Sequence, residues 1–222
     1  MAVERRVGAS EADILTVQTN LANSYSLLGR DEEALPMRRD VYSGCLKLNG
    51  EEHNSSILAA NNYAVMLKDL RHFEEAKSLL QKTMPVARRV LGEGHDLTLA
   101  MRWIYAGVLY EDASATLDEI REAVKTLEDT ERVARRVFGG AHPRTTAIEG
   151  KLQECRAAGL ARMPAEPRFD KAARASNPAK GLVHYLGRLK KAKWRGSARK
   201  IAKFGRKVQK YSKLAVAAVE TS

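Results

Sequence analysis

Apolar and small side chains recur at alternating steps of three and four residues along much of this chain. This spacing places them on one face of an α-helix. A first helix is predicted to start at Ser10 and Asp13, which have the spacing of a capping box, and to end near Gly29. Its apolar and small positions are Leu15, Leu21, Ala22, Tyr25 and Leu28.

The same spacing predicts further helices that follow one another in pairs. Acidic residues at 31–33 favour a helix start, because negative charge complements the N-terminal end of the helix dipole. Pro85 is expected to kink a later helix or divide it near Thr83, because proline removes a backbone hydrogen bond. The predicted helices cover about residues 31–48, 55–69, 74–91, 117–138 and 145–158.

A period of 42 residues relates these pairs to one another. Gly-Glu-Glu-His at 50–53 returns as Gly-Glu-Gly-His at 92–95, and Asn-Leu-Ala at 20–22 corresponds to Asn-Tyr-Ala at 62–64. The third pair is longer by five residues, which we expect in the turn around 111–116, because loops tolerate insertions. A period of this length predicts stacked helical hairpins that share one continuous core.

The predicted fold is therefore all-α, a solenoid of about three helical hairpins with a capping helix, followed by a basic helical tail. The capping helix carries polar residues, among them Lys151, that suit the outer face of an array. The predicted boundaries are an N-terminal arm (1–12), a repeat array (13–158, with repeats 13–54, 55–96 and 97–143 and the cap 144–158), a linker (159–180) and the tail (181–222).

Positive charge is concentrated at the C-terminal end. The net charge is +11, and residues 160–222 hold 17 lysine and arginine residues against 3 aspartate and glutamate residues. Segments 181–195 and 201–218 have apolar positions at helical spacing and cations on their other faces, a pattern that binds anionic surfaces. The cations expected to bind an anionic partner are Lys190, Lys191, Lys193, Arg195, Arg199, Lys200, Lys203, Arg206, Lys207 and Lys210.

The chemistry of that anionic partner stays open at this point. An anionic membrane, a nucleic acid, an acidic protein surface and a groove of the protein itself each suit a basic helix. Residues 190–193 also fit a short nuclear-import pattern. The alternative without a partner is a solvated tail, or one that packs on the open end of the array.

The period and its marks resemble the tetratricopeptide repeat, in the 42-residue form found in kinesin light chains and related proteins. The resemblance covers about residues 13–158. It rests on the recurring Gly-x-x-His mark, on the Asn-Leu-Ala and Leu-Gly-Arg segments at 20–22 and 28–30, and on the Glu-Ala pairs at 33–34 and 75–76. It implies a concave groove, lined by the first helix of each hairpin, that receives a peptide.

In such a groove, asparagine amides would hold the peptide backbone, because a primary amide both donates and accepts hydrogen bonds. The third repeat departs from this pattern, since it has Trp103-Ile104 where the second has Asn61-Asn62. Trp103 suits either the core or an aromatic anchor in the groove. The candidate groove residues are Asn20, Asn23, Asn61, Asn62, Lys68 and Trp103.

The sequence predicts no enzyme, no cofactor and no metal site. It contains no glycine-rich phosphate loop, His-Glu-x-x-His motif or nucleophile elbow. His53, His95 and His142 occupy equivalent repeat positions, which packed helices hold about 8–10 Å apart, too far for one zinc ion. We expect these histidines to cap helices. Cys45 and Cys155 lack disulfide or metal-ligand spacing and suit a reducing compartment.

The expected function is a non-enzymatic scaffold or adaptor that binds a protein or peptide partner in its groove and an anionic partner through its tail. The alternative is a nucleic-acid-associated or nuclear protein whose tail binds DNA or RNA and whose repeats mediate assembly. No stretch approaches 18 consecutive apolar residues, and no apolar block follows Arg5 and Arg6. The expected location is therefore intracellular, in the cytoplasm first and the nucleus second. The identity of the peptide and the oligomeric state stay open.

Overall fold

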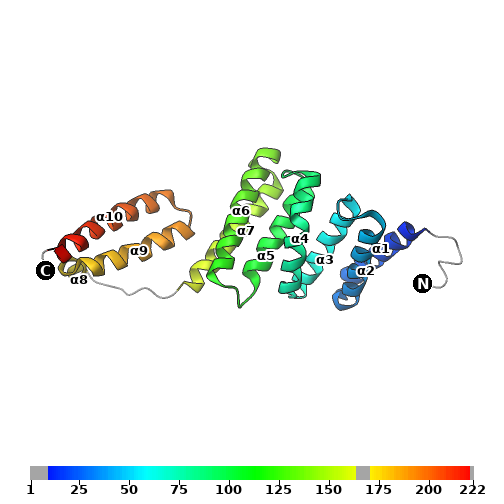
Figure 1. Ribbon diagram of the computed structural model, residues 1–222, viewed down its shortest axis with the longest axis horizontal. Helices are drawn as coiled ribbons and strands as arrows, with labels where there is room; N and C mark the ends of the chain where they lie inside the picture. The colour runs from blue at the N-terminus through cyan, green and yellow to red at the C-terminus, as the bar shows by residue number, and fades with distance from the viewer. Residues whose placement is uncertain (1–9, 164–170, 221–222) are drawn as a thin grey trace. The chain divides into compact units, whose positions relative to one another are not determined.

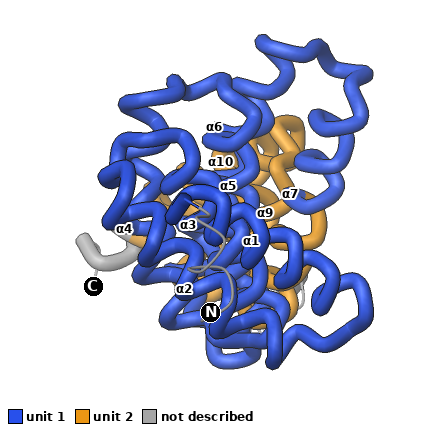
Figure 2. The backbone as a smooth tube through the Cα atoms, turned by 90° about the vertical axis from the view of Figure 1, so that its right-hand side faces the viewer, with its two compact units in different colours: residues 1–152 blue, residues 153–222 orange. Residues whose placement is uncertain are grey.

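The computed structural model describes residues 10–163 and 171–220 of the 222-residue chain, and every regular element in these ranges is a helix (Figure 1). Two compact units are present, residues 1–152 and 153–222 (Figure 2). The helices are α1 (Glu11–Leu27), α2 (Asp31–Asn49), α3 (Asn54–Asp69), α4 (Phe73–Leu91), α5 (Asp96–Glu111), α6 (Leu117–Phe138), α7 (Pro143–Arg162), α8 (Lys171–Ser176), α9 (Pro178–Trp194) and α10 (Ala198–Glu220).

The first unit is a stack of helical hairpins. α1 packs against α2, α3 against α4 and α5 against α6. Contacts of α2 with α3, of α4 with α5 and of α3 with α5 join successive hairpins. Figure 1 shows these helices following one another in chain order. Each hairpin shares its apolar face with the next, so the predicted all-α solenoid is confirmed.

Alanines at equivalent positions form the centre of each hairpin. In the first hairpin, Ala22 of α1 and Ala34 of α2 are fully buried in one cluster with Met66 of α3. A methyl side chain lets two helix backbones approach closely, and a larger one would have to displace packed neighbours. The 42-residue period thus preserves the spacing between helices. The equivalent, fully buried alanines of the other hairpins are Ala64, Ala76, Ala106 and Ala123.

Glycine ends the second helix of each hairpin. Gly50, Gly92 and Gly139 follow the last residues of α2, α4 and α6, and each accepts a left-handed backbone, with φ of 81°, 92° and 91°. Residues with a Cβ are strained in this conformation, whereas glycine is not. The glycine of the repeated Gly-x-x-His mark is therefore a helix stop.

The histidine of the same mark starts the next helix. His95 is the N-cap of α5, and its Nδ1 accepts a hydrogen bond from the Leu97 amide at 3.2 Å. This bond satisfies one of the backbone N–H groups that a helix start leaves without a partner. The prediction that the three histidines cap helices is confirmed. The equivalent bonds are Ser55 N to His53 Nδ1 (3.2 Å) and Arg144 N to His142 Nδ1 (3.1 Å).

Prolines lie inside two helices without ending them. α4 runs unbroken through Pro85, so the expected division near Thr83 is wrong. Pro36 lies likewise inside α2. Each proline removes one backbone hydrogen bond, but the buried neighbours Thr83 and Val86 anchor α4 on both sides of Pro85. Packing therefore outweighs the local cost.

The turn between α5 and α6 has five residues, 112–116, whereas the turns after α1 and α3 have three. Two of the five inserted residues therefore lie in the predicted turn, and the other three extend the start of α6. Asp112 Oδ1 accepts a hydrogen bond from the Ser114 amide at 2.8 Å, and Ala115 is buried. Thr116 then caps α6 and forms a capping box with Glu119. The insertion is thus ordered by its own turn chemistry.

α7 extends past both ends of the expected capping helix, and it crosses the division between the two units. Gly159 lies inside α7 and leaves room for α9, since a Cβ at position 159 would lie 2.3 Å from the Trp194 ring. Lys151 does not occupy an outer face, since its Nζ lies 2.9 Å from Glu111 Oε1 of α5. The segment expected to be a linker, 159–180, therefore contains the last turn of α7 as well as α8.

The second unit contains a hairpin of α9 and α10, which pack against each other. Asn177 caps α9, and its Oδ1 accepts a hydrogen bond from the Ala179 amide at 3.0 Å. Gly196, with φ of 62°, lies in the turn between the helices. Both basic segments of the tail are thus helical, as predicted. Residues 164–170 of the expected linker and most of the expected N-terminal arm lie outside the described residues.

Candidate functional site

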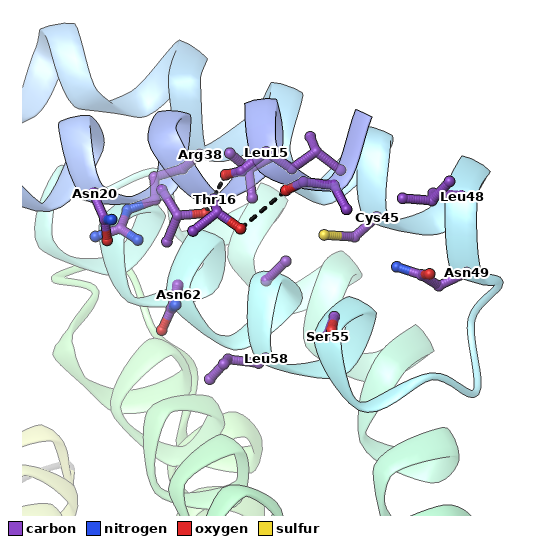
Figure 3. A pocket seen from close by; sticks show the side chains of 14 residues that line it. Leu15, Thr16, Asn20, Arg38, Cys45, Leu48, Asn49, Ser55, Leu58 and Asn62 are labelled. Carbon is purple, nitrogen blue, oxygen red and sulfur yellow. Dashed lines mark hydrogen bonds between the residues drawn. The ribbon is translucent and has the colours of Figure 1, made fainter. Parts of the chain in front are cut away.

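A pocket of about 260 Å³ opens between α1, α2 and α3 (Figure 3). Two of its three walls, α1 and α3, are the first helices of successive hairpins, and the third is α2. Most of its surface is apolar, and two leucines in it, Leu48 and Leu58, are 43% and 48% exposed. Exposed leucines that line a concavity are suited to bind apolar groups. The apolar lining comprises Ala12, Leu15, Val41, Cys45, Leu48, Leu58 and Ala59.

One end of the pocket is polar. Asn20 of α1, Arg38 of α2 and Asn62 of α3 lie at this end, away from Leu48 and Asn49 (Figure 3). The period of 42 residues brings the two asparagines together, because they occupy the same position on neighbouring first helices. Two amides and a guanidinium thus adjoin one apolar concavity.

The hydroxyl groups in this pocket are already used within their own helix. Thr16 Oγ1 donates to the Ala12 carbonyl at 2.9 Å, and Thr19 Oγ1 donates to the Leu15 carbonyl at 2.8 Å (Figure 3). The Asn20 amide, in contrast, makes no hydrogen bond within the described residues. Asn20 therefore retains both a donor and an acceptor for a ligand.

Arg38 is a buried cation without a carboxylate partner among the described residues. It is 9% exposed, and one Nη donates to Asn23 Oδ1 at 2.6 Å. Its Nε is buried and has no hydrogen-bond partner there. Burial holds the pKa of the guanidinium below its ordinary value. A buried and incompletely satisfied charge is costly, so an anionic group in the pocket would be favoured.

Two other predicted groove asparagines serve mainly within the protein. Asn23 supplies the oxygen that holds Arg38. Asn61 lies beside Asn62, and its Nδ2 is 3.5 Å from Asn62 Oδ1. Its own Oδ1 is buried and has no hydrogen-bond partner in the described chain. Asn23 and Asn61 thus lie next to the pocket residues and are not themselves part of the pocket lining.

Lys68 contributes to an ion-pair network on the third hairpin. Its Nζ lies 3.3 Å from Glu111 Oε2, and Lys151 binds the other oxygen of the same carboxylate. Burial raises the pKa of Glu111, but the hydrogen bonds and charges of both lysines outweigh it and hold the pKa below its ordinary value. Gly107 makes room for the Lys68 side chain, since a Cβ there would lie 3.3 Å from Lys68 Cδ. Lys68 is therefore neutralised inside the protein.

Trp103 is half-buried on α5. Neither Trp103 nor Lys68 lines the pocket that contains Asn20 and Asn62. Of the six candidate groove residues, the structure thus brings Asn20 and Asn62 into one pocket, places Asn23 and Asn61 beside it, and leaves Lys68 and Trp103 farther along the array.

The predicted anion-binding cations lie on the α9–α10 hairpin and the turn that joins its helices. Nine of the ten are exposed, and Lys191 is half-buried. None of the ten forms an ion pair with a carboxylate in the part of the chain that the structure describes. The exposed nine are Lys190, Lys193, Arg195, Arg199, Lys200, Lys203, Arg206, Lys207 and Lys210.

No helix in residues 10–163 and 171–220 is long and apolar enough to cross a membrane. The same ranges contain no cluster of three or more histidine, cysteine, aspartate or glutamate side chains that could hold a metal ion.

Arg38 was not among the residues predicted from the sequence, although its position carries a signal. Ala34, Val41 and Cys45 are all buried, and Arg38 falls between them at the same helical spacing. An arginine at a core position is uncommon unless it has a specific partner. A cation that interrupts an apolar face is thus a sign of a buried polar site.

Comparison with known proteins supports the fold. The family model of the tetratricopeptide repeat matches residues 13–89. Two crystal structures of a putative kinesin light chain with nearly identical TPR-like repeats from Podosopora anserina are similar to this chain, each at 19% sequence identity. The first covers 89% of this chain and 94% of its own, with a TM-score of 0.52. The second, of a variant with one substitution, covers 96% of this chain and 100% of its own, with a TM-score of 0.54.

A search of curated proteins found no match. The matched residues span the first repeat and most of the second, which include all three helices of the pocket. The shared fold extends over the remaining hairpin. Residues 13–89 therefore match the tetratricopeptide repeat family, and the fold of the chain is similar to that of the kinesin light chain-like repeat structures.

Proposed function

We propose that this protein is a non-enzymatic scaffold that binds a peptide segment of a partner in the α1–α2–α3 pocket and an anionic partner through its basic tail. Tetratricopeptide repeats indicate a protein interaction scaffold, and the family is generally non-enzymatic. The geometry of the pocket supports its assignment as the peptide site.

The observation that carries the peptide proposal is the presence of Asn20 and Asn62 at the edge of one apolar pocket. A peptide backbone presents alternating donors and acceptors, which primary amides on neighbouring helices can match. The apolar walls would accept a side chain of the same segment. Arg38 at the polar end favours a segment with a carboxylate, because that charge would complete its hydrogen bonding.

Selection from a random peptide display library on the full-length chain tests this proposal. We expect enriched peptides that bind wild type, and at least tenfold weaker binding to Asn20→Ala/Asn62→Ala, from the loss of about two hydrogen bonds. The matched control is Asn54→Ala/Gln153→Ala, which removes two exposed amides outside the pocket. Failure to enrich any peptide, or equal binding by the two double variants, would overturn the peptide proposal.

A second candidate function places the main activity in the tail. Residues 171–219 contain 15 lysine and arginine residues and no aspartate or glutamate. This composition favours a nucleic-acid-associated protein in which the repeats mediate assembly. Binding of a nucleic acid by the full-length chain, together with no peptide enrichment, would favour this candidate over the scaffold.

A further inference from the structure

The aromatic side chains of the α9–α10 hairpin lie between its two helices. Tyr185 of α9 stacks on Tyr211 of α10 with ring centroids 5.3 Å apart, and the Phe204 centroid lies 6.5 Å from that of Tyr185. A Cβ at Gly181 would lie 2.3 Å from the Tyr211 ring, so the helices are in close contact there. The aromatic residues of the apolar stripe predicted for α10 therefore pack against α9, and the described residues of this stripe are half-buried.

Few large apolar side chains of this hairpin remain exposed. Trp194 at the end of α9 is 8% exposed, and its ring packs against Gly159 within the same unit. Among the described side chains, the large exposed ones are the aliphatic residues Val183, Leu186 and Leu214. No aromatic side chain is among them, so the outer surface offers cations and scattered aliphatic groups.

The cations of α10 form a row along its outer side. Arg199, Lys203, Arg206, Lys210 and Lys213 are all exposed and follow one another at steps of four and three residues. These steps keep them on one face of the helix, over a length of about 21 Å. None of the five pairs with a carboxylate among the described residues. The row is therefore a continuous line of positive charge along α10.

We propose that this hairpin binds the phosphate backbone of a nucleic acid. The inference rests on the proposed anionic partner of the tail and names its chemical class. A membrane-binding amphipathic helix buries an exposed apolar stripe in the bilayer surface, and here that stripe is half-buried against α9. A protein interface draws most of its energy from aromatic and other anchors, and here Tyr185, Phe204 and Tyr211 are half-buried against one another. Binding to a phosphate backbone needs neither an exposed apolar stripe nor aromatic anchors. Lysine and arginine side chains displace counterions from the nucleic acid, and this release supplies the affinity.

The same geometry limits the ability of the hairpin to recognise a base sequence. Successive cations of the row advance by about 5 Å along the helix, of the same order as the phosphate spacing of about 3.4 Å per strand along DNA. Arg188 lies over Phe204, with its guanidinium 4.9 Å from the ring centroid, so that ring is not available to stack on a base. Binding is therefore independent of base sequence and directed to the phosphodiester chain that DNA and RNA share.

Fluorescence anisotropy with the full-length chain tests the proposal. The probes are a labelled 20-bp duplex DNA in two unrelated sequences and a labelled 20-nucleotide single-stranded RNA, each titrated from about 50 to 200 mM salt, the range over which backbone binding weakens strongly. We expect equal affinity for the two duplex sequences and a steep loss of affinity with salt. The two nucleic-acid types distinguish DNA from RNA as the source of the backbone.

The decisive variant is Arg199→Gln/Lys203→Gln/Arg206→Gln/Lys210→Gln. We expect the slope of log affinity against log salt on duplex DNA to fall in magnitude by about 3 to 4, or about 0.9 for each phosphate that the variant no longer neutralises. The matched control, Lys47→Gln/Lys82→Gln/Lys125→Gln/Arg136→Gln, removes the same charge from exposed positions of the repeat array. Equal slopes for the row variant and wild type would overturn the proposal.

Vesicles with phosphatidylserine and a poly-glutamate peptide are the competing probes. Binding of either at least as tightly as nucleic acid would reject the nucleic-acid assignment and leave an anionic partner in place. Binding of none of the probes would reject both this inference and the tail part of the proposed function. The peptide part of the proposed function is tested independently, because Asn20→Ala/Asn62→Ala changes the pocket and leaves the α9–α10 hairpin unchanged.

Discussion

The Lys77 ammonium of α4 lies 2.5 Å from Glu119 Oε1 at the start of α6. The other oxygen of this carboxylate accepts hydrogen bonds from the Thr116 amide and hydroxyl, both at 2.9 Å. The hydrogen bond from Lys77 and the two from Thr116 lower the pKa of Glu119 from its ordinary value to about 2. One side chain thus caps α6 and joins the second hairpin to the third.

We predict that Glu119→Gln lowers the free energy of unfolding by about 1–2 kcal/mol at pH 7, because it removes charge-assisted hydrogen bonds. The folded-state pKa lies below that of the unfolded chain. The stabilisation is therefore full above about pH 5 and is lost as the pH falls towards 2. Urea unfolding at pH 7 and pH 3 measures this difference.

The expected result is that wild type loses more stability than Glu119→Gln between the two pH values. Glu32→Gln is the control, because Glu32 is exposed and has no ion pair within the described residues. An equal loss in wild type and Glu119→Gln would contradict the role of this carboxylate.

Arg38→Met is predicted to separate binding from stability. The substitution removes a buried charge and keeps most of the side-chain volume, so the free energy of unfolding should stay the same or rise by about 1 kcal/mol. Peptides selected on wild type that contain a carboxylate should bind the variant at least tenfold more weakly. Urea unfolding and fluorescence anisotropy with those peptides measure the two effects. A loss of more than about 2 kcal/mol in stability would instead assign Arg38 a structural role.

Two glycines of the hairpin should respond in opposite directions to alanine. Gly181→Ala places a methyl group against the Tyr211 ring and should destabilise the hairpin by about 1–3 kcal/mol. Gly205→Ala places it in open space on α10 and should stabilise the helix by about 0.5–1 kcal/mol. Amide hydrogen exchange of α9 and α10 in the full-length chain measures both. Faster exchange in Gly205→Ala, or unchanged exchange in Gly181→Ala, would contradict the packing of the two helices.

The helical array could be predicted because the sequence features that specify it are local or periodic. Gly92 and His95 determine a helix end and a helix start within four residues, and both roles follow from backbone chemistry alone. The pairing of Asn20 with Asn62 followed from the period. Lys68 was different, because its direction depends on the space that Gly107 leaves and on a carboxylate 43 residues away. A long side chain on a surface helix can point several ways, and only tertiary neighbours decide among them.

The tail shows a second limit of sequence reasoning. The spacing of Phe204 and Tyr211 correctly indicated an apolar face on a helix. An amphipathic pattern shows that a face must be covered, but it does not identify what covers it. The structure adds Tyr185 and the small Gly181, through which α9 packs on that face. The pattern alone therefore allowed membrane insertion, and the packing of α9 on this face now disfavours it.

The pocket also affects the stability of α1, the first helix of the array. α1 has one buried residue, Ala22, among those that the structure describes, whereas α3 has eight. A helix with so little buried surface opens often, and its amides exchange with solvent. A peptide bound between α1 and α3 would contact both helices and so stabilise the position of α1 against α3. Part of the binding free energy would then be spent on suppressing fraying, so ligand affinity and the mobility of α1 would change together.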